Sequence, residues 1–154
     1  MVCLNQDLTQ ISWFHPEIFV YYYKMKTVLI VDDNEIDRLI HTKILERIKE
    51  VRDIHTASNG DEAINLLNEY FQQVKSLPHI ILLDLNMPIM DGFAFIESFK
   101  NLSLAGKENV TIAIVTSSSS RADIQKAKEK GIDIYLEKPL SEEKLLNALC
   151  EDRQ

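Results

Sequence analysis

Residues 27–33 read TVLIVDD, a short run of β-branched and apolar residues that ends in two aspartates. The run has no polar alternation, which is typical of a strand buried on both faces. Strands of parallel sheets are buried in this way because helices cover both sides of the sheet. The stretch therefore predicts a central parallel strand that presents Asp32 and Asp33 at its carboxyl end.

Three further apolar runs end in a polar residue. They are 79–84 (HIILLD), 110–116 (VTIAIVT) and 132–138 (IDIYLEK), which end in Asp84, Thr116 and Lys138. In an open parallel sheet, ligands bind in the crevice at the carboxyl ends of the strands. Three carboxylates, one hydroxyl and one ammonium are therefore expected to meet there. Such a set predicts a site for a metal ion and a phosphoryl group.

Helical patterns separate these strands. The predicted strands are 27–31, 53–57, 79–83, 110–115 and 132–136, and the predicted helices are 34–49, 61–73, 93–101, a helix ending at 130 and a last helix capped by Ser141. Residues 53–57 alternate more than the other strands, which places them nearer an edge. Five strands alternating with five helices predict a doubly wound α/β fold, with helices on both faces of a five-stranded parallel sheet.

Two of the predicted helices differ in their apolar residues. The helix capped by Asn34 has isoleucines at every fourth position, with Leu39 beside them; these are Ile36, Ile40, Ile44 and Ile48. The helix that ends at residue 130 has few apolar residues, so we expect the sheet to hold it weakly.

Composition sets the broad class of protein. The chain has 154 residues, 45% of them hydrophobic and 27% charged, with a formal net charge of −7. This suggests one globular domain and argues against nonspecific nucleic-acid binding, which needs a basic surface. No apolar run approaches the roughly 18–20 residues of a membrane span. We therefore expect a cytoplasmic protein without a membrane partner, in which Cys3 and Cys150 are unpaired thiols.

Residues 1–25 differ from the rest. They hold the single tryptophan and the uncharged run 18–23 (IFVYYY), which has high β-propensity. This extension could pack on the domain, add an edge strand or mediate association. Alternatively, the natural start is Met25, because residues 25–27 lead directly into the first strand. The main domain is expected over residues 26–154.

The acidic residues suggest a specific chemistry. Asp32, Asp33 and Asp84 would repel one another unless a cation offset their charge. Hard oxygen ligands at an open site suit Mg²⁺, and a carboxylate such as Asp84 can accept a phosphoryl group. Taken alone, the Asp32-Asp33 pair could simply cap the following helix. Likewise, Thr116 alone could be an ordinary strand residue and Lys138 a solvated lysine.

Four motifs together resemble the receiver domain of two-component response regulators. They are VLIVDDN (28–34), LLDLNMPIMDG (82–92), IAIVTS (112–117) and YLEKP (135–139). The resemblance covers residues 27 to about 150, with all four motifs in the family's order. It implies the flavodoxin-like strand order 2-1-3-4-5, for which the chemotaxis receiver is a standard example.

The resemblance also implies roles for individual residues. Asp84 would be the phosphoacceptor, and Lys138 and Thr116 would contact the phosphoryl group. Mg²⁺ would be bound directly by Asp33 and Asp84, through water by Asp32, and by the main-chain carbonyl of Asn86. Thr116 and Tyr135 match the family's switch pair, and the Lys138-Pro139 peptide is expected to be cis. Tyr135 could instead be an edge-strand aromatic with its hydroxyl in water.

The implied function is a stand-alone response regulator. A sensor histidine kinase or histidine phosphotransfer protein would donate the phosphoryl group, and a protein effector would read a conformational switch. The protein would be a monomer or weak dimer. Asn86 and Ser118, each two residues beyond a key position, are small and polar, so neither an unusually long-lived nor a blocked aspartyl phosphate is expected.

Three other functions fit the sequence less well. A phosphohydrolase usually has a second acid two residues after its nucleophile, where this chain has Asn86. A nucleotide-binding protein would need a glycine-rich phosphate loop, and the chain has four glycines and neither standard motif. The third is a receiver-like module that binds partners without phosphorylation, which the complete acid cluster argues against. The expected protein is thus a phosphoacceptor and not an enzyme acting on external substrates.

Overall fold

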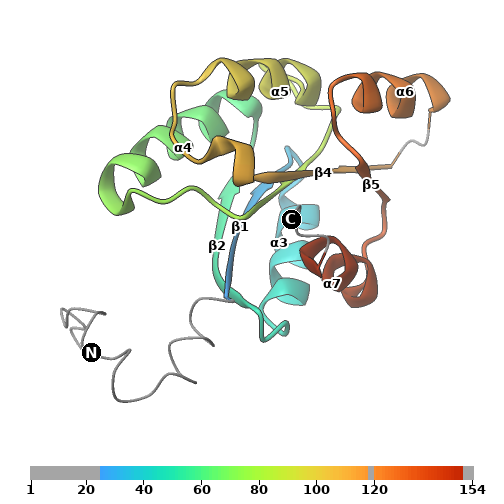
Figure 1. The fold of residues 1–154 in the computed structure, drawn as a ribbon. Helices are drawn as coiled ribbons and strands as arrows, with labels where there is room; N and C mark the ends of the chain where they lie inside the picture. The colour runs from blue at the N-terminus through green and yellow to red at the C-terminus, as the bar shows by residue number, and fades with distance from the viewer. Residues whose placement is uncertain (1–24, 118–119, 151–154) are drawn as a thin grey trace.

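The computed structural model describes residues 25–117 and 120–150, without the side chains of residues 71 and 72. The expectations for residues 1–24, including Cys3, and for Ser118 lie outside the described residues. Strands and helices alternate along the chain (Figure 1). In chain order they are β1 (Lys26–Val31), α3 (Glu35–Leu45), β2 (Val51–Ala57), α4 (Gly60–Val74), β3 (Ile80–Leu83), α5 (Gly92–Asn101), the short 3₁₀ helix η1 (Lys107–Asn109), β4 (Thr111–Thr116), α6 (Arg121–Glu129), β5 (Ile134–Glu137) and α7 (Glu142–Cys150).

The five strands form one parallel sheet in the order β2-β1-β3-β4-β5. This confirms the predicted fold class and strand order, with β2 at an edge. Val31 is in register with Leu83, and Leu83 with Ile114. Because the strands are parallel and in step, the residues that follow them emerge at one edge of the sheet. The Asp84 N–H donates to the Val31 carbonyl at 2.8 Å, which continues the ladder into the site.

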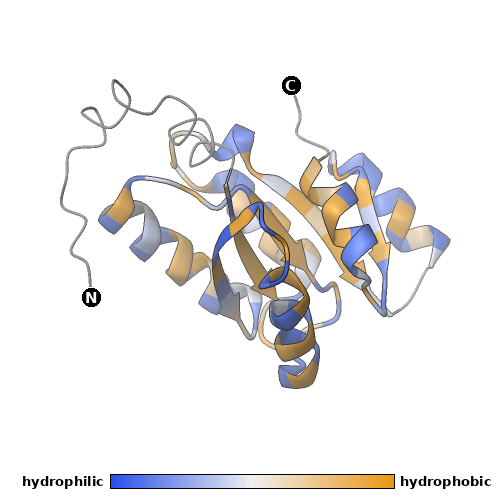
Figure 2. Ribbon diagram, turned by 90° about the horizontal axis from the view of Figure 1, so that it is seen from below, coloured by the Kyte–Doolittle hydropathy of each residue, from blue (hydrophilic) through white to orange (hydrophobic). Residues whose placement is uncertain are grey.

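Helices cover both faces of the sheet (Figure 1). Along β1, Leu29 and Val31 belong to one core cluster, whereas Val28 and Ile30 belong to the other. The first cluster includes residues of α4, α5 and α6, and the second includes residues of α3 and α7. Figure 2 shows the hydrophobic colour concentrated along the strands between these two layers. Among the described residues, no helix is long and apolar enough to cross a membrane.

The predicted apolar stripe identified the first helix, but only the later part of the stripe is buried. Ile36 is 67% exposed, and Leu39 and Ile40 are also exposed. The helix instead buries His41 and Leu45 against the sheet, and it ends at Leu45 rather than at residue 49. The later isoleucines do meet the core, since Ile44 packs against the second core cluster and Ile48, just past the helix, is 3% exposed. Three large apolar side chains of α3 are left in solvent in the first half of the helix.

The last strand also starts later than predicted, at Ile134 rather than at residue 132. Gly131 adopts a left-handed conformation with φ of 74°, and the Ile132 N–H donates to the Ala127 carbonyl at 3.0 Å. This pattern closes a helix C-terminus. Ile132 therefore belongs to the end of α6, although its apolar side chain suggested a strand.

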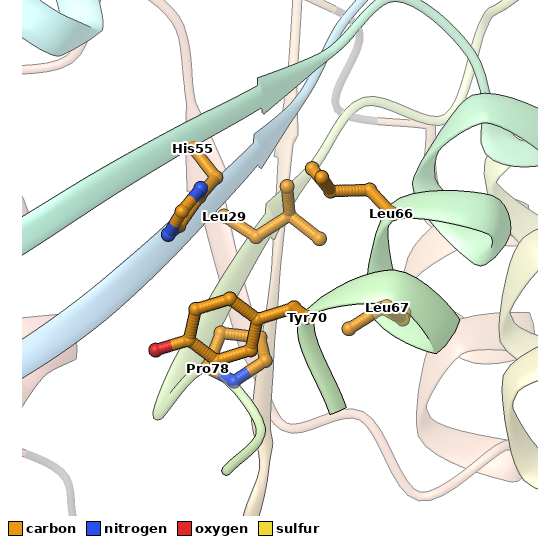
Figure 3. A pocket seen from close by; sticks show the side chains of 6 residues that line it. All are labelled: Leu29, His55, Leu66, Leu67, Tyr70 and Pro78. Carbon is orange, nitrogen blue, oxygen red and sulfur yellow. The ribbon is translucent and has the colours of Figure 1, made fainter. Parts of the chain in front are cut away.

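A small hollow lies between β2 and α4 (Figure 3). The rings of His55 and Tyr70 meet edge to face there, with centroids 5.0 Å apart. The other lining residues are Leu29, Leu66, Leu67 and Pro78. Among the described residues, no protein atom forms a hydrogen bond with the buried Nε2 of His55. The hollow has room for about one water molecule.

Candidate functional site

The predicted acid cluster forms at the carboxyl edge of the sheet. Asp32 and Asp33 follow β1 and Asp84 follows β3, and one carboxylate oxygen from each lies within 4.8 Å of the others. Asp32 is 2% exposed and Asp84 is 7% exposed, whereas Asp33 is open to solvent. The site therefore has a buried floor and one acid at its mouth.

Lys138 brings a positive charge into this cluster from the end of β5. Its Nζ lies 2.6 Å from an oxygen of Asp32 and 3.4 Å from an oxygen of Asp84. The Lys138 N–H donates to the Thr116 carbonyl at 2.9 Å, which ties its backbone to the end of β4. The ammonium is therefore a member of the site and not a solvated surface lysine. The Lys138-Pro139 peptide is cis, as expected from the family resemblance.

Burial and charge act in opposite directions on Lys138. Burial lowers its pKa, but hydrogen bonds to Asp32 and Asp37 and the charge of Asp84 outweigh that effect. The net result is a pKa above the usual value for lysine. The ammonium therefore stays charged throughout the neutral range.

Burial and neighbouring charges act on the Asp84 carboxylate. Burial raises its pKa above the ordinary value, and the charge of Asp32 acts in the same direction. A hydrogen bond from the Asn86 N–H, 3.2 Å long, and the charge of Lys138 oppose the rise. The net rise shows that one ammonium does not fully offset the burial of this carboxylate and the charge beside it.

The donor set suits Mg²⁺. Asp32, Asp33 and Asp84 offer hard carboxylate oxygens, which this ion prefers, at a site that is open at Asp33. A divalent cation would also relieve the repulsion that contributes to the raised pKa of Asp84. The Asn86 side chain is exposed beside the cluster, and its main-chain carbonyl is in the segment that follows Asp84. The residues present therefore fit the metal that the sequence suggested.

A constrained loop connects Asp84 to α5. The Gly92 N–H donates to the Leu85 carbonyl at 3.0 Å, and a Cβ at Gly92 would lie 2.5 Å from the Asp84 carbonyl oxygen. Only glycine fits this close approach. Asp91 caps α5 by accepting from the Ala94 N–H at 2.8 Å. These contacts hold the loop close against the end of β3.

The two predicted switch residues lie next to each other. Thr116 ends β4 and is 1% exposed, whereas Tyr135 on β5 is half-buried and packs against the first core cluster. Burial and the charge of Asp123 raise the pKa of the Tyr135 hydroxyl, and a side-chain hydrogen bond with Thr116 opposes this rise. Tyr135 is thus neither a fully solvated edge residue nor fully enclosed.

Sequence reasoning missed three residues on α3 that surround the site. The Asp37 carboxylate accepts from Lys138 Nζ at 2.8 Å, and Arg38 Nη1 donates to the Asp32 carbonyl at 2.6 Å. His41 is buried behind them, and its burial lowers its pKa despite the charge of Asp32. The sequence did contain one indication of their role. They lie in the first two turns of α3 after its cap Asn34, and side chains there point back toward the carboxyl end of β1.

A cleft of about 610 Å³ adjoins the cluster and could admit a reactant. It is lined by Asp33, Leu85, Asn86, Met87, Pro88, Asp91, Phe93, Asp123 and Lys126. Lys126 of α6 lies over the Phe93 ring, with Nζ 4.1 Å from the centroid. The cleft therefore connects the acid cluster to the contact between α5 and α6.

Comparison with known proteins agrees with this geometry. The family described as response regulator receiver domain matches residues 28–150. The chain is 33% identical over 124 residues to the nitrate/nitrite response regulator protein NarL of Escherichia coli K12, covering 80% of this chain and 52% of that protein. It is 32% identical over 126 residues to the chemotaxis protein CheY of Halobacterium salinarum, covering 82% and 95%.

Other relatives extend the comparison. A segment of the sensor histidine kinase CheAY of Helicobacter pylori is 31% identical over 118 residues, which cover 77% of this chain and 14% of that protein. The crystal structure of a two component response regulator from Cytophaga hutchinsonii superposes with a TM-score of 0.74 at 32% identity, covering 81% of this chain and 94% of that one. The chain thus spans about half of NarL but nearly all of the CheY protein of Halobacterium salinarum.

Proposed function

The chain belongs to the response regulator receiver domain family, and on this premise we propose that Asp84 accepts a phosphoryl group from a phosphohistidine protein in a Mg²⁺-dependent reaction. The donor would be a sensor histidine kinase or a histidine phosphotransfer protein. The observation that carries the proposal is the position of Asp84, a buried carboxylate with a raised pKa between two other acids and one ammonium.

In the proposed step, an Asp84 carboxylate oxygen attacks phosphorus and the phosphorus–nitrogen bond of the donor breaks. The electron pair of that bond stays on the imidazole, which takes up a proton, and the product is an aspartyl phosphate. Lys138 Nζ, 3.4 Å from Asp84 Oδ2, would donate to a phosphoryl oxygen. The Thr116 hydroxyl would donate to another. A bound Mg²⁺, held by Asp33, Asp84, the Asn86 carbonyl and through water by Asp32, would neutralise part of the phosphoryl charge.

The signal would pass through Thr116 and Tyr135. A phosphoryl group on Asp84 would draw the Thr116 hydroxyl away from Tyr135, and the tyrosine would move further inward. Helix α6 buries one residue, Ala127, over its fully described length, so it is the element that such a change could displace. A protein effector would read the altered face formed by α6, β5 and α7.

Transfer from a labelled donor tests the proposed reaction. A panel of autophosphorylated sensor kinases carrying ³²P-phosphohistidine would be mixed with the protein, with and without Mg²⁺. We expect label on the wild type only when Mg²⁺ is present, no label on Asp84→Asn, and normal labelling of the matched acid control Asp61→Asn. Equal labelling of wild type and Asp84→Asn would contradict the assignment of Asp84.

The proposed switch has a separate test. Tyr135→Ala should still accept the phosphoryl group, because the hydrogen bond of Tyr135 is with Thr116 and not with Asp84. In ¹H–¹⁵N spectra, phosphorylation should shift the α6 amides of wild type several-fold more than those of Tyr135→Ala. Equal shifts in both proteins would show that Tyr135 does not transmit the change.

A further inference from the structure

A second cavity lies at the opposite end of the sheet from the acid cluster. It has a volume of about 360 Å³ and sits where α5 and α6 end and β4 and β5 begin. Its lining includes the apolar residues Phe99, Ile112 and Ile132 and the lysines Lys100, Lys107 and Lys130. Small-molecule sites start at about 300 Å³, so the cavity has the size of a site for a small organic molecule.

The cavity combines an apolar floor with a basic rim. Phe99, Ile112 and Ile132 are 4–8% exposed and belong to the first core cluster. Lys100 and Lys107 stand above them at the rim. With Lys130, the lining holds three lysines against one acid, Glu108, and Lys130 is paired with Glu97 outside the lining. A local excess of positive charge remains, on a chain whose formal net charge is −7. An anion with an apolar body would match both parts of the cavity.

Each lysine also has a structural partner. Lys107 Nζ donates to the Leu102 carbonyl at 2.6 Å, Lys100 Nζ donates to the Lys130 carbonyl, and Lys130 Nζ pairs with Glu97. These contacts place cations at the C-terminal ends of α5 and α6, where helix dipoles favour them. An ammonium has three donor hydrogens, and the bonds among the described residues use at most two on each of these lysines. The partners therefore fix the ammonium groups in place and leave donors for a ligand.

We propose that this cavity binds a small organic anion, a carboxylate joined to an aromatic or short aliphatic body. The carboxylate would accept hydrogen bonds from Lys100 and Lys130, and the body would lie on Phe99 and Ile132. The proposal does not depend on phosphorylation of Asp84. It has a structural consequence, because the Lys100 contact with the Lys130 carbonyl joins the end of α6 to α5. An anion bound in this cavity would therefore contact the lysine that holds the end of α6 against α5.

Titration with 4-phenylbutyrate, followed in ¹H–¹⁵N spectra at constant ionic strength, tests the site. For a ligand of about 12 heavy atoms in an open cavity, we expect a dissociation constant on the order of 1 mM. The shifts should concentrate on the amides of Val110, Gly131 and Ile132. The neutral 4-phenylbutanamide and acetate, which lack one of the two recognised parts, should each bind at least several-fold more weakly.

Two variants separate the site from general charge. Lys100→Gln should weaken 4-phenylbutyrate binding about tenfold, the effect of losing one charge-assisted hydrogen bond. Lys128→Gln removes an equal charge from the exposed surface of α6, outside the cavity lining, and should bind like wild type. Lys130→Gln is the second site variant if Lys100→Gln does not fold.

Several results would overturn the proposal. The first is an absence of saturable shifts up to about 20 mM ligand, well above the expected dissociation constant. The second is equal affinity for 4-phenylbutyrate and its neutral amide. The third is equal weakening of 4-phenylbutyrate binding by Lys128→Gln and Lys100→Gln. The first result would show that the lysines serve only to cap the helices. The second result would show that the cavity does not recognise the negative charge of the ligand. The third would show that the ligand is attracted by the overall positive charge around α6 and not by Lys100.

Discussion

Two strand–helix pairs of the sheet, β3 with α5 and β5 with α6, differ in how firmly they are packed. On the side of the acid cluster, every residue of β3 is buried, and α5 buries four residues, including Phe95. On the other side, no residue of β5 is fully buried, and α6 buries only Ala127; both elements are described along their whole length. The acids thus stand on a firmly packed frame, whereas Tyr135 stands on a loosely packed one.

This difference in packing matches two different requirements of the proposed function, a fixed reaction site and a movable element. Phosphoryl transfer needs the reacting carboxylate of Asp84 held at a fixed position, since misplacement of reacting groups slows transfer steeply. A signal instead needs an element with a low cost of rearrangement, and such elements have few buried apolar contacts. The pair β3 and α5 meets the first requirement, and the pair β5 and α6 meets the second.

A matched pair of leucines should show the largest effect. Leu82 of β3 is 2% exposed, whereas Leu136 of β5 is half-buried, and both pack in the second core cluster. Leu82→Ala should lower the free energy of unfolding by about 3–4 kcal/mol and Leu136→Ala by about 1–2 kcal/mol. Urea unfolding followed by circular dichroism gives both values. Equal losses would contradict the contrast between the two strand–helix pairs.

Hydrogen exchange tests the same contrast without mutation. Amides of α6 should exchange through openings about 2 kcal/mol less costly than those of α5, because α6 buries so little apolar surface. Mass spectrometry of peptides from each helix would measure the difference. Similar protection of the two helices would remove the physical basis for assigning α6 to the switch.

Removing the Asp84 charge should stabilise the metal-free frame. Because the folded-state pKa of Asp84 is raised, the folded protein holds this proton more tightly than the unfolded chain does. Wild-type stability therefore falls as pH rises from the ordinary aspartate pKa through the raised one, and the loss is complete above it. Asp84→Asn lacks this loss, so at neutral pH without Mg²⁺ it should be more stable by roughly 1 kcal/mol in urea unfolding. The gain should shrink as pH is lowered toward the ordinary aspartate pKa, and a gain independent of pH would contradict the burial of a charged carboxylate as its cause.

A smaller effect concerns strain in the loop after Asp84. Ile89 is 85% exposed and has φ of 70°, a conformation unfavourable for a β-branched residue. Ile89→Asn should stabilise the protein by about 0.5–1 kcal/mol, because asparagine tolerates the left-handed region. The control Ile36→Asn, at an exposed helical position, should be neutral or slightly destabilising. Thermal unfolding of the three proteins would decide, and a stabilisation common to both variants would point to the loss of an exposed apolar side chain rather than to the backbone.

The sequence was most informative where a single continuous stretch of residues determined both a strand and the site residue at its end. The apolar runs that end at Asp32, Asp84 and Thr116 predicted buried parallel strands, and the structure has these strands in one sheet. It also brings the carboxylates of Asp32, Asp33 and Asp84 together, as expected. The cis peptide before Pro139 also agrees with the expectation drawn from the family resemblance.

The rest depended on how elements dock. The position of Asp37 beside Lys138 and the exposure of Ile36 both follow from the rotation of α3 on the sheet, which its own periodicity does not specify. The late start of β5 follows from the closure of α6 at Gly131 and Ile132, where an apolar residue completes a helix end rather than a strand. In both cases the outcome depends on a contact, of α3 with the sheet or of Ile132 with the end of α6, that the spacing of apolar residues does not reveal.

Intact-mass spectrometry after incubation with acetyl phosphate tests the central claim most directly. The claim is that Asp84, on its firmly packed frame, accepts a phosphoryl group with the help of a divalent cation. We predict a mass gain of about 80 Da, one phosphoryl group, in wild type with Mg²⁺. The gain should be absent in Asp84→Asn and in wild type treated with a chelator. A gain that persists in Asp84→Asn, or no gain in wild type with acetyl phosphate or with any of the labelled kinases, would contradict the account.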